Sequence, residues 1–321
     1  MISKKNIKGQ KNMKNISGGY IKNFIPIFLN SITVKNNSKN TYSRSLHQFI
    51  HYIDLNDSSS INTCSISNYI KHLQNNNLSD FTISNYITIL KKFFSWCCSE
   101  NICEDFSKNI NFKTKITGFR KKALKISDIS NLLDSIKRDS IADYRNYALI
   151  NLMVRTGLRV VEISRANHSD IKPGYDSKLL YIHGKGRSGK DEFVILTPDC
   201  YAPLNDFFEK ISNEGFCINE NTPIFPSFAR KNYFEKMSTR SISRIIKNAF
   251  NNIGLNTKEY SAHSLRHTAV TFCLLGGGSV QEAQILARHC NINTTMIYAQ
   301  NINRIKDAPE KYIDNLLKNI Q

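Results

Sequence analysis

An arginine and a glutamate follow a Gly-Leu break in the stretch RTGLRVVEIS, which covers residues 155–164. Arg159 begins a new turn after this break, so its side chain would point into a cleft. Glu162 lies three residues later on the same helical face, where it could form an ion pair with Arg159. The alternative is an ordinary exposed pair, which would contribute well under about 1 kcal/mol to stability.

A glycine-rich basic turn, GKGRSGKD at residues 184–191, lies between two short β-like runs at 179–183 and 192–196. This arrangement predicts a β-hairpin that carries Lys185 between two glycines. Such a turn can bring backbone amides and an ammonium group close to a phosphate. It lacks the GxxxxGK[ST] spacing of a nucleotide-binding P-loop. The alternative is an exposed hairpin without a ligand.

Two histidines and an arginine occur together in YSAHSLRHTA, residues 260–269. His263 and Arg266 are three residues apart and therefore share a helical face. His263 and His267 are four apart, a spacing that also suggests a metal site. Ser264 stands where an HExxH site has its glutamate, and no third ligand is spaced nearby, so zinc is disfavoured. Buried or capping histidines are the common alternative.

The last segment of interest is ARHCNINTTMIYAQ, residues 287–300. His289 ends one expected helix, and Thr294 and Thr295 begin a short helix that holds Tyr298. A tyrosine at such a position is usually a half-buried packing residue and only rarely a nucleophile. This segment alone therefore favours packing.

The order of the four segments changes this interpretation. They occur as Arg, Lys, His-x-x-Arg, His and Tyr, and in this order the sequence resembles the tyrosine recombinase (phage integrase) family. The matching motifs are TGLRVVE at residues 156–162, GKG at 184–186, HSLRH at 263–267 and the His, Thr-Thr and Tyr of 289–298. The N-terminal stretch LSDFTISNYITILKKFFSW also looks like that family's core-binding domain. The resemblance covers nearly the whole chain beyond its first residues.

The resemblance implies a role for each matching residue. The implied catalytic set is two arginines, a hairpin lysine, two histidines and a nucleophilic tyrosine: Arg159, Arg266, Lys185, His263, His289 and Tyr298. Glu162 would support Arg159. No cofactor and no metal is implied. Arg288 departs from the family pattern, which often has glycine before the histidine, and this puts the local loop geometry in doubt.

The chemistry of DNA strand cleavage explains these residue types. Attack on a phosphodiester adds negative charge to the non-bridging oxygens, and two guanidinium groups can bind those oxygens without a metal. A tyrosine nucleophile conserves the bond energy in a 3′-phosphotyrosyl link, so rejoining needs no ATP. The phenol has a reference pKa near ~10 and needs a proton acceptor or a positive field. Lys185 is the natural proton donor to the leaving 5′ oxygen.

The elements that must position these residues form two expected domains. Residues 1–16 are a flexible basic tail, 17–112 a helical core-binding (SAM-like) DNA-binding domain, 113–122 a linker, and 123–321 a catalytic domain with a C-terminal interaction helix. We expect a mainly α fold with a small β-sheet, arranged as a two-domain C-shaped DNA clamp. Apolar periodicity predicts helices in the first domain at 20–29, 42–53, 65–73 and from Ser79 onward, and a short one that breaks at Asn101.

The same periodicity predicts most of the second domain as helices. The expected ranges are 127–137, 141–156, 159–165, 201–209, 239–253, 264–275, 279–289, 294–298 and 308–319. Ser279 and Glu282 form a capping-box pattern at the start of one of them.

Composition narrows the class of partner. The chain has 321 residues, 40% of them hydrophobic, and a formal net charge of +18. Such a charge attracts polyanions, with nucleic acid first and an anionic membrane surface as the rival. No apolar run is long enough to span a bilayer, so we expect a cytoplasmic protein without a membrane partner. The eight scattered cysteines form no CxxC pair and are expected to be reduced, mostly buried thiols.

The expected partner is therefore double-stranded DNA carrying a recombination site. The resemblance implies a homo-tetramer on paired sites, or a hetero-tetramer with a related recombinase. DNA integration or excision by a mobile element and Xer-like dimer resolution both fit. Two alternatives remain, a non-catalytic DNA-binding relative and a type IB topoisomerase-like enzyme.

Overall fold

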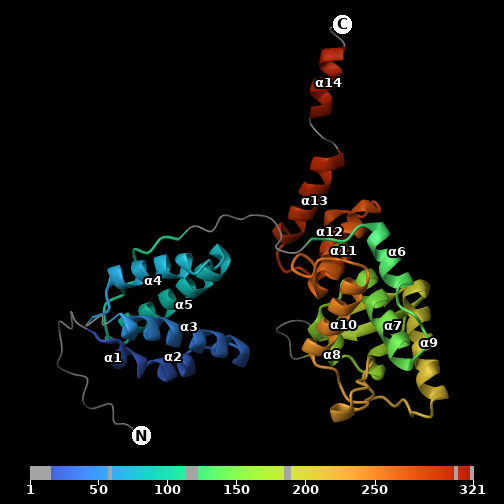
Figure 1. The fold of residues 1–321 in the computed structure, drawn as a ribbon, viewed down its shortest axis with the longest axis horizontal. Helices are drawn as coiled ribbons and strands as arrows, with labels where there is room; N and C mark the ends of the chain where they lie inside the picture. The colour runs from blue at the N-terminus through green and yellow to red at the C-terminus, as the bar shows by residue number, and fades with distance from the viewer. Residues whose placement is uncertain (1–15, 57–59, 113–121, 184–188, 307–309, 319–321) are drawn as a thin grey trace. The chain divides into compact units, whose positions relative to one another are not determined.

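The computed structural model describes residues 16–56, 60–112, 122–183, 189–306 and 310–318 (Figure 1). The chain divides into two compact units, Met1–Thr117 and Gly118–Gln321. Helices dominate the described part of both units, and a small sheet lies in the second. The predicted mainly α fold with a small sheet is confirmed. The expected clamp concerns the placement of one unit relative to the other, and it stays a prediction.

The described part of the first unit consists of helices. They are α1 (Gly18–Lys22), α2 (Ile25–Ser31), α3 (Asn36–Leu55), α4 (Thr63–Asn75) and α5 (Asp80–Ser99). Ser79 caps α5 as predicted, because its hydroxyl accepts a hydrogen bond from the Thr82 amide at 3.3 Å.

Two helix predictions in this unit were wrong. The helix expected at 20–29 is divided into α1 and α2, and Pro26 lies in the first turn of α2, where its missing amide hydrogen costs nothing. The short helix expected to break at Asn101 is not formed among the described residues. The preceding helix α5 continues to Ser99, and Asn101 has a left-handed backbone (φ +57) that ends it.

Aromatic side chains make up much of the core of this unit. The ring of Phe28 on α2 meets that of Phe93 on α5 edge-on, with centroids 5.3 Å apart. Phe49 on α3 meets Tyr69 on α4 in the same way at 5.2 Å. All four side chains are buried. Edge-to-face pairs of this kind stabilise the packing beyond the apolar area that they bury.

The sheet in the second unit contains β1 (Ile171–Pro173), β2 (Lys178–Ile182) and β3 (Glu192–Leu196), antiparallel in that order. The predicted hairpin corresponds to β2 and β3, in which Leu180 pairs with Val194. Both of these side chains are buried, whereas Phe193 and Ile195 point to the other face and are about half exposed. Strand β1 was not predicted, because three residues are too short for a period-two pattern.

The remaining described elements of the second unit are two short 3-10 helices, His168–Asp170 and Arg230–Asn232, and a larger set of α-helices. The α-helices are α6 (Ile126–Asp134), α7 (Ile141–Thr156), α8 (Val160–Arg165), α9 (Pro198–Asn213), α10 (Thr239–Asn252), α11 (Ala262–Leu275), α12 (Val280–Ala287), α13 (Asn293–Lys306) and α14 (Glu310–Lys318). Helix α7 packs against α9 and α11, and every residue from Ala148 to Val154 is buried. A helix apolar on all sides belongs in the centre of a domain.

Helices α11, α12 and α13 pack against one another at one end of this unit (Figure 1). The predicted capping box begins α12: the Ser279 hydroxyl accepts from the Glu282 amide at 3.2 Å, and the Glu282 carboxylate accepts from the Ser279 amide at 2.7 Å. The short helix expected at 294–298 is only the first part of α13, which continues to Lys306. Ile302 and Ile305 follow Tyr298 at i+4 and i+7, an apolar period that the prediction did not use.

Among the described residues, no helix combines the length and apolarity needed to cross a membrane. All eight cysteines are free thiols, but the expectation that most are buried was wrong. Cys97 and Cys200 are buried, whereas Cys64, Cys98, Cys217 and Cys290 are exposed. Cys64 and Cys98 lie on the solvent faces of α4 and α5, which composition alone cannot reveal.

Candidate active site

The junction between α7 and α8 places Arg159. Gly157 follows the last residue of α7 in a left-handed conformation (φ +61), which glycine adopts without steric cost. A Cβ added there would lie 3.4 Å from the Cβ of Ala269, so the end of α7 fits closely against α11. The chain then turns, and Arg159 is the N-cap residue of α8.

Glu162 is buried, and both of its carboxylate oxygens accept hydrogen bonds from arginines. Arg159 Nη1 donates to Oε1 at 2.7 Å, and Arg288 Nη2 donates to Oε2 at 2.9 Å. Burial alone would raise the pKa of Glu162, but Arg288 and Arg159 outweigh burial and hold this pKa below its ordinary value. The predicted pairing with Arg159 is present, and the alternative of an exposed surface pair is wrong.

Arg266 is an almost fully buried arginine on α11, with 2% of its surface exposed. Its Nη1 donates to the Gly157 carbonyl oxygen at 2.7 Å, and its Nη2 contacts the carbonyl oxygen of Ala287 at the end of α12. Burial, followed by repulsion from Arg159 and Arg288, lowers the pKa of Arg266 to about 9. The guanidinium is therefore still charged at neutral pH. The ends of α7 and α12 hold it in place, and Glu162 neutralises its charge only in part.

Tyr298 lies on α13 with 5% of its surface exposed, and its phenolic oxygen contacts Nδ1 of His267 on α11. The two ring centroids are 5.3 Å apart. Burial raises the pKa of Tyr298, and the charge of Arg266 opposes that rise. The phenol therefore points toward the arginine and histidine cluster, as the nucleophile prediction requires.

His263 and His289 flank this contact. The His263 ring lies edge-on to His267 at 4.4 Å, and the His289 ring is stacked 6.5 Å from Tyr298. Nδ1 of His289 forms a 2.9 Å hydrogen bond with the Thr295 hydroxyl. Burial, followed by the charges of Arg266 and Arg159, lowers the pKa of His289 to about 4. The same causes lower the pKa of His263.

Lys185 and the glycines beside it lie outside the described residues. Strands β2 and β3, which end at Ile182 and begin at Glu192, lead into and out of this turn. Lys190, near the end of the turn, contacts the carboxylate of the buried Asp170.

Sequence reasoning missed two residues of the cluster. His267 was noted as the last residue of the HSLRH motif and as a possible metal partner of His263, but it was given no catalytic role, although it touches the phenol of Tyr298. Arg288 was noted as a departure from the glycine pattern, and its conformation is left-handed (φ +52), which explains why glycine suits the position. Its guanidinium turns back to Glu162. The arginine in place of the usual glycine was the signal that the sequence offered. Only the fold shows that the side chain of Arg288 reaches Glu162.

Taken together, the described cluster contains three arginines, three histidines and one tyrosine from α8, α11, α13 and the loop after α12. One carboxylate, that of Glu162, lies among the three arginines. Such a site can bind an anion, since the arginines repel one another until negative charge arrives. It also holds a phenol beside an imidazole, the combination needed for nucleophilic attack.

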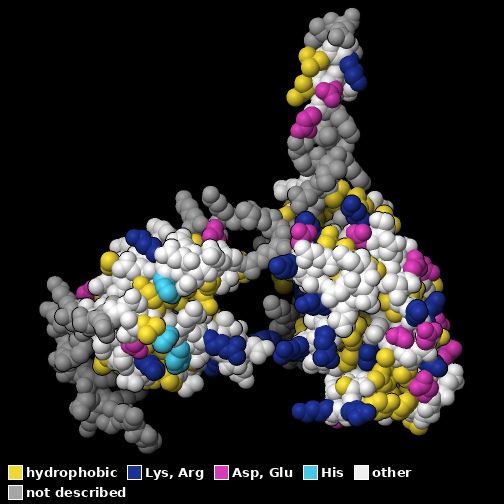
Figure 2. Space-filling model, in the orientation of Figure 1, with side chains coloured by type: hydrophobic (Ala, Val, Ile, Leu, Met, Phe, Trp, Pro, Cys, Tyr) yellow, Lys and Arg dark blue, Asp and Glu magenta, His cyan; other side chains and the backbone are white. Residues whose placement is uncertain are grey.

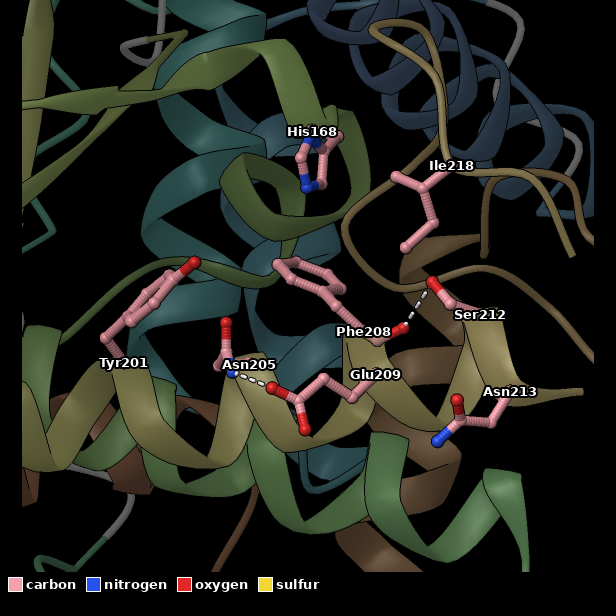
Figure 3. A pocket seen from close by; sticks show the side chains of 8 residues that line it. All are labelled: His168, Tyr201, Asn205, Phe208, Glu209, Ser212, Asn213 and Ile218. Atoms are coloured by element: carbon pink, nitrogen blue, oxygen red, sulfur yellow. Dashed lines mark hydrogen bonds between the residues drawn. The ribbon is translucent and has the colours of Figure 1, made fainter.

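A separate hollow of about 490 Å³ lies along α9 and is lined by residues outside the four motifs (Figure 3). Phe208 and His168 stack edge-on at 4.9 Å on one side of it. The lining residues are His168, Tyr201, Asn205, Phe208, Glu209, Ser212, Asn213 and Ile218. None of the predicted catalytic residues lines it, so we do not assign the chemistry to this hollow.

Comparison with known proteins supports the resemblance. The phage integrase family profile matches residues 122–304, and the profile of the phage integrase N-terminal SAM-like domain matches residues 27–101. The tyrosine recombinase XerD of Rickettsia conorii is 28% identical over 305 residues, which cover 90% of this chain and 97% of that protein. XerD of Rickettsia prowazekii is also 28% identical, over 90% of this chain and 95% of that protein.

Solved structures share the fold. The XerH site-specific recombinase bound to difH substrate, in a pre-cleavage complex, matches with a TM-score of 0.70 at 19% identity, over 93% of this chain and 97% of that one. A lambda integrase dimer bound to a COC′ core site matches with a TM-score of 0.65 at 16% identity, over 86% and 96%.

The chain therefore belongs to the phage integrase family. Within that family it is a site-specific tyrosine recombinase, an enzyme that cuts and rejoins DNA strands.

Proposed function

We propose that Tyr298 attacks a DNA phosphodiester and forms a 3′-phosphotyrosyl intermediate. The observation that carries this proposal is the phenolic oxygen of Tyr298, which lies against His267 beside the buried Arg266. Arg159 and Arg266 bind the non-bridging oxygens of the scissile phosphate. Preorganised cations stabilise the charge that develops in the transition state without having to rearrange.

The other residues have supporting roles in the proposed reaction. Glu162 orients Arg159 through its two hydrogen bonds to that residue's side chain and amide. His263 and His289 donate hydrogen bonds to the same phosphate oxygens. Lys185 protonates the leaving 5′ oxygen. No metal is needed, since the arginines carry the positive charge that a metal would otherwise supply.

The proposed substrate is double-stranded DNA. Helix α10 presents Arg240, Arg244 and Lys247 to solvent at a spacing that places them on one face. Figure 2 shows Lys and Arg gathered along the edge of the second unit that carries α8 and α10, and more Asp and Glu along the edge that carries α9. Because phosphate contacts release counterions, binding should weaken steeply as salt concentration rises.

The proposed assembly is a tetramer on two paired sites, formed by this chain alone or with a related recombinase. Helix α14 exposes Tyr312, Ile313, Leu316 and Leu317 by 71%, 62%, 66% and 58%. Four apolar side chains so exposed on one short helix are typical of a docking element. We propose that α14 docks onto a neighbouring recombinase subunit.

Similarity to XerD over nearly the whole length of that relative favours a Xer-like role in resolving chromosome or plasmid dimers. Integration of a mobile element is the second candidate, favoured by the shared fold with lambda integrase and with the Tn1549 transposon integrase. A paired-site assay separates recombination from topoisomerase activity, because recombinant products require two sites. We place the reaction in the cytoplasm, where such DNA resides in bacteria.

The test is covalent capture of DNA. The protein is incubated with nicked suicide duplexes that contain candidate target sites, and denaturing gels are searched for a protein–DNA adduct. Wild-type protein should form the adduct, and Tyr298→Phe should lose it while still binding DNA. Tyr201→Phe, on α9 away from the motifs, is the matched control and should form the adduct. An adduct formed by Tyr298→Phe would refute the assignment of the nucleophile.

A further inference from the structure

We propose that His267 is an additional catalytic residue, which accepts the phenolic proton of Tyr298 as the phenolic oxygen attacks phosphorus. The inference rests on the proposed function, and it assigns a role to a histidine outside the predicted catalytic set. The observation behind it is the contact between Nδ1 of His267 and the hydroxyl of Tyr298.

The fold brings these two residues together across 31 positions of sequence. Helix α11 begins at the capping box formed by Ser261 and Ser264, which fixes the helix register just before His267. Helix α13 packs against α11, so Tyr298 faces the middle of the latter helix. Both side chains are only 5% exposed. A phenolic proton in this position has little direct access to bulk water and needs an acceptor within the protein.

Burial and the nearby charges keep His267 neutral and therefore able to accept a proton. Burial, then His263 and Arg266 on α11 and His289 after α12, lowers the pKa of His267 to about 3. Tyr298 is the group that faces it from α13. An imidazole with so low a pKa is a weak base in the absence of DNA. A phosphodiester bound to Arg159 and Arg266 would offset part of this positive charge and make the imidazole more basic.

The two neighbouring histidines are engaged differently. Nδ1 of His289 is hydrogen-bonded to the Thr295 hydroxyl at 2.9 Å, and the ring is stacked against Tyr298. His263 is partly exposed at the surface of α11, and its ring packs on that of His267. These positions suit contact with an incoming phosphate. Nδ1 of His267 is the imidazole nitrogen placed at the phenolic oxygen.

The O–H bond of Tyr298 breaks, and its proton moves to Nδ1 of His267, which requires the tautomer protonated at Nε2. The phenolic oxygen bonds to phosphorus as the bond from phosphorus to the 5′ oxygen breaks. The departing 5′ oxygen takes its proton from the general acid, assigned above to Lys185. During rejoining, His267 returns its proton to the phenolate oxygen.

A pair of substitutions separates proton acceptance from simple positioning. His267→Asn keeps a polar atom near the Nδ1 position but cannot accept a proton at neutral pH, whereas His267→Ala removes both properties. If His267 accepts the proton, both variants should slow adduct formation by about 100-fold or more, the usual scale of general-base catalysis. Wild-type rates in His267→Asn would overturn the proposal. Melting curves and DNA binding serve as folding controls.

A more acidic phenol provides the decisive readout. With 3,5-difluorotyrosine at position 298, the phenolic proton is easier to lose, so cleavage should depend less on an acceptor. We expect this replacement to restore at least ten-fold activity to His267→Asn but not to Arg266→Ala. Failure to restore His267→Asn selectively would contradict the proposal.

A test without substitution at position 267 covers the case in which both variants fail to fold. Nitrogen-15 NMR of histidine-labelled protein should show His267 protonated at Nε2 and not at Nδ1. The opposite tautomer would overturn the proposal.

If wild-type protein forms no adduct at Tyr298, the proposed function fails. If wild-type and His267→Asn form it equally fast, only the present inference fails.

Discussion

Arg288 donates from Nη2 to Oε2 of Glu162 at 2.9 Å, across 126 positions of sequence. The contact joins the residue after α12 to the first turn of α8. Since the other oxygen of Glu162 accepts from Arg159, one buried carboxylate connects a predicted catalytic arginine to the loop that carries His289. Glu162 and Arg288 expose 0% and 7% of their side chains. Solvent therefore screens this ion pair very little.

Replacement of Arg288 should destabilise the protein despite its strained backbone. Arg288→Gly relieves a left-handed conformation worth about 1 kcal/mol but removes the buried ion pair. Arg159 remains to neutralise Glu162, so we expect a net loss of about 1–3 kcal/mol, below the full cost of leaving a buried charge unpaired. Arg288→Ala keeps the backbone cost and should be less stable than Arg288→Gly. Urea unfolding measures the stabilities of the three proteins. If Arg288→Gly is more stable than wild type, the Arg288–Glu162 ion pair makes no net contribution to the free energy of unfolding.

Lysine should not replace Arg266 in DNA cleavage. Arg266→Lys keeps a positive charge but cannot reach both the Gly157 and Ala287 carbonyl oxygens and also present a donor to phosphate. We expect Arg266→Lys and Arg266→Ala to slow adduct formation by at least about 100-fold, the scale of losing one preorganised donor. Arg155→Lys is the control, since Arg155 is half exposed and pairs with Asp199 at 3.6 Å. Equal rates for Arg266→Lys and wild type would contradict the role.

Two histidines of the cluster, whose pKa values are lowered in the fold, should make the protein acid-sensitive. The pKa of His289 is lowered to about 4 and that of His267 to about 3, below the ordinary value of about 6.5 expected in the unfolded chain. As pH falls from about 6.5 toward 4, the unfolded chain therefore binds protons that the folded chain does not, and stability is lost. The free energy of unfolding should fall between pH 7 and pH 5, and it should fall less steeply in His289→Gln. Parallel pH profiles for the two proteins would argue against this linkage.

Local signals were sufficient for most of the helices. Ser79 and Ser279 each begin a helix because a hydroxyl can satisfy the free amides at a helix start, and this depends only on nearby residues. Gly157 ends α7 for an equally local reason, since glycine accepts a positive φ. Strand β1 was not predicted, because a strand of three residues is defined by its pairing with β2. No local sequence pattern indicates that pairing.

The sequence by itself determined the fold class and indicated most residues of the cluster, because apolar periodicity and motif order are properties of the linear chain. It could not determine which histidine meets Tyr298. His263, His267 and His289 are the same residue type, and only the packing of α13 on α11 places the phenol against His267. The sequence likewise shows that Arg288 stands where the family often has glycine. Its pairing with Glu162, however, depends on the contact between segments distant in sequence. Contacts of this kind are decided by the tertiary structure, since side-chain direction follows from helix packing and not from sequence spacing.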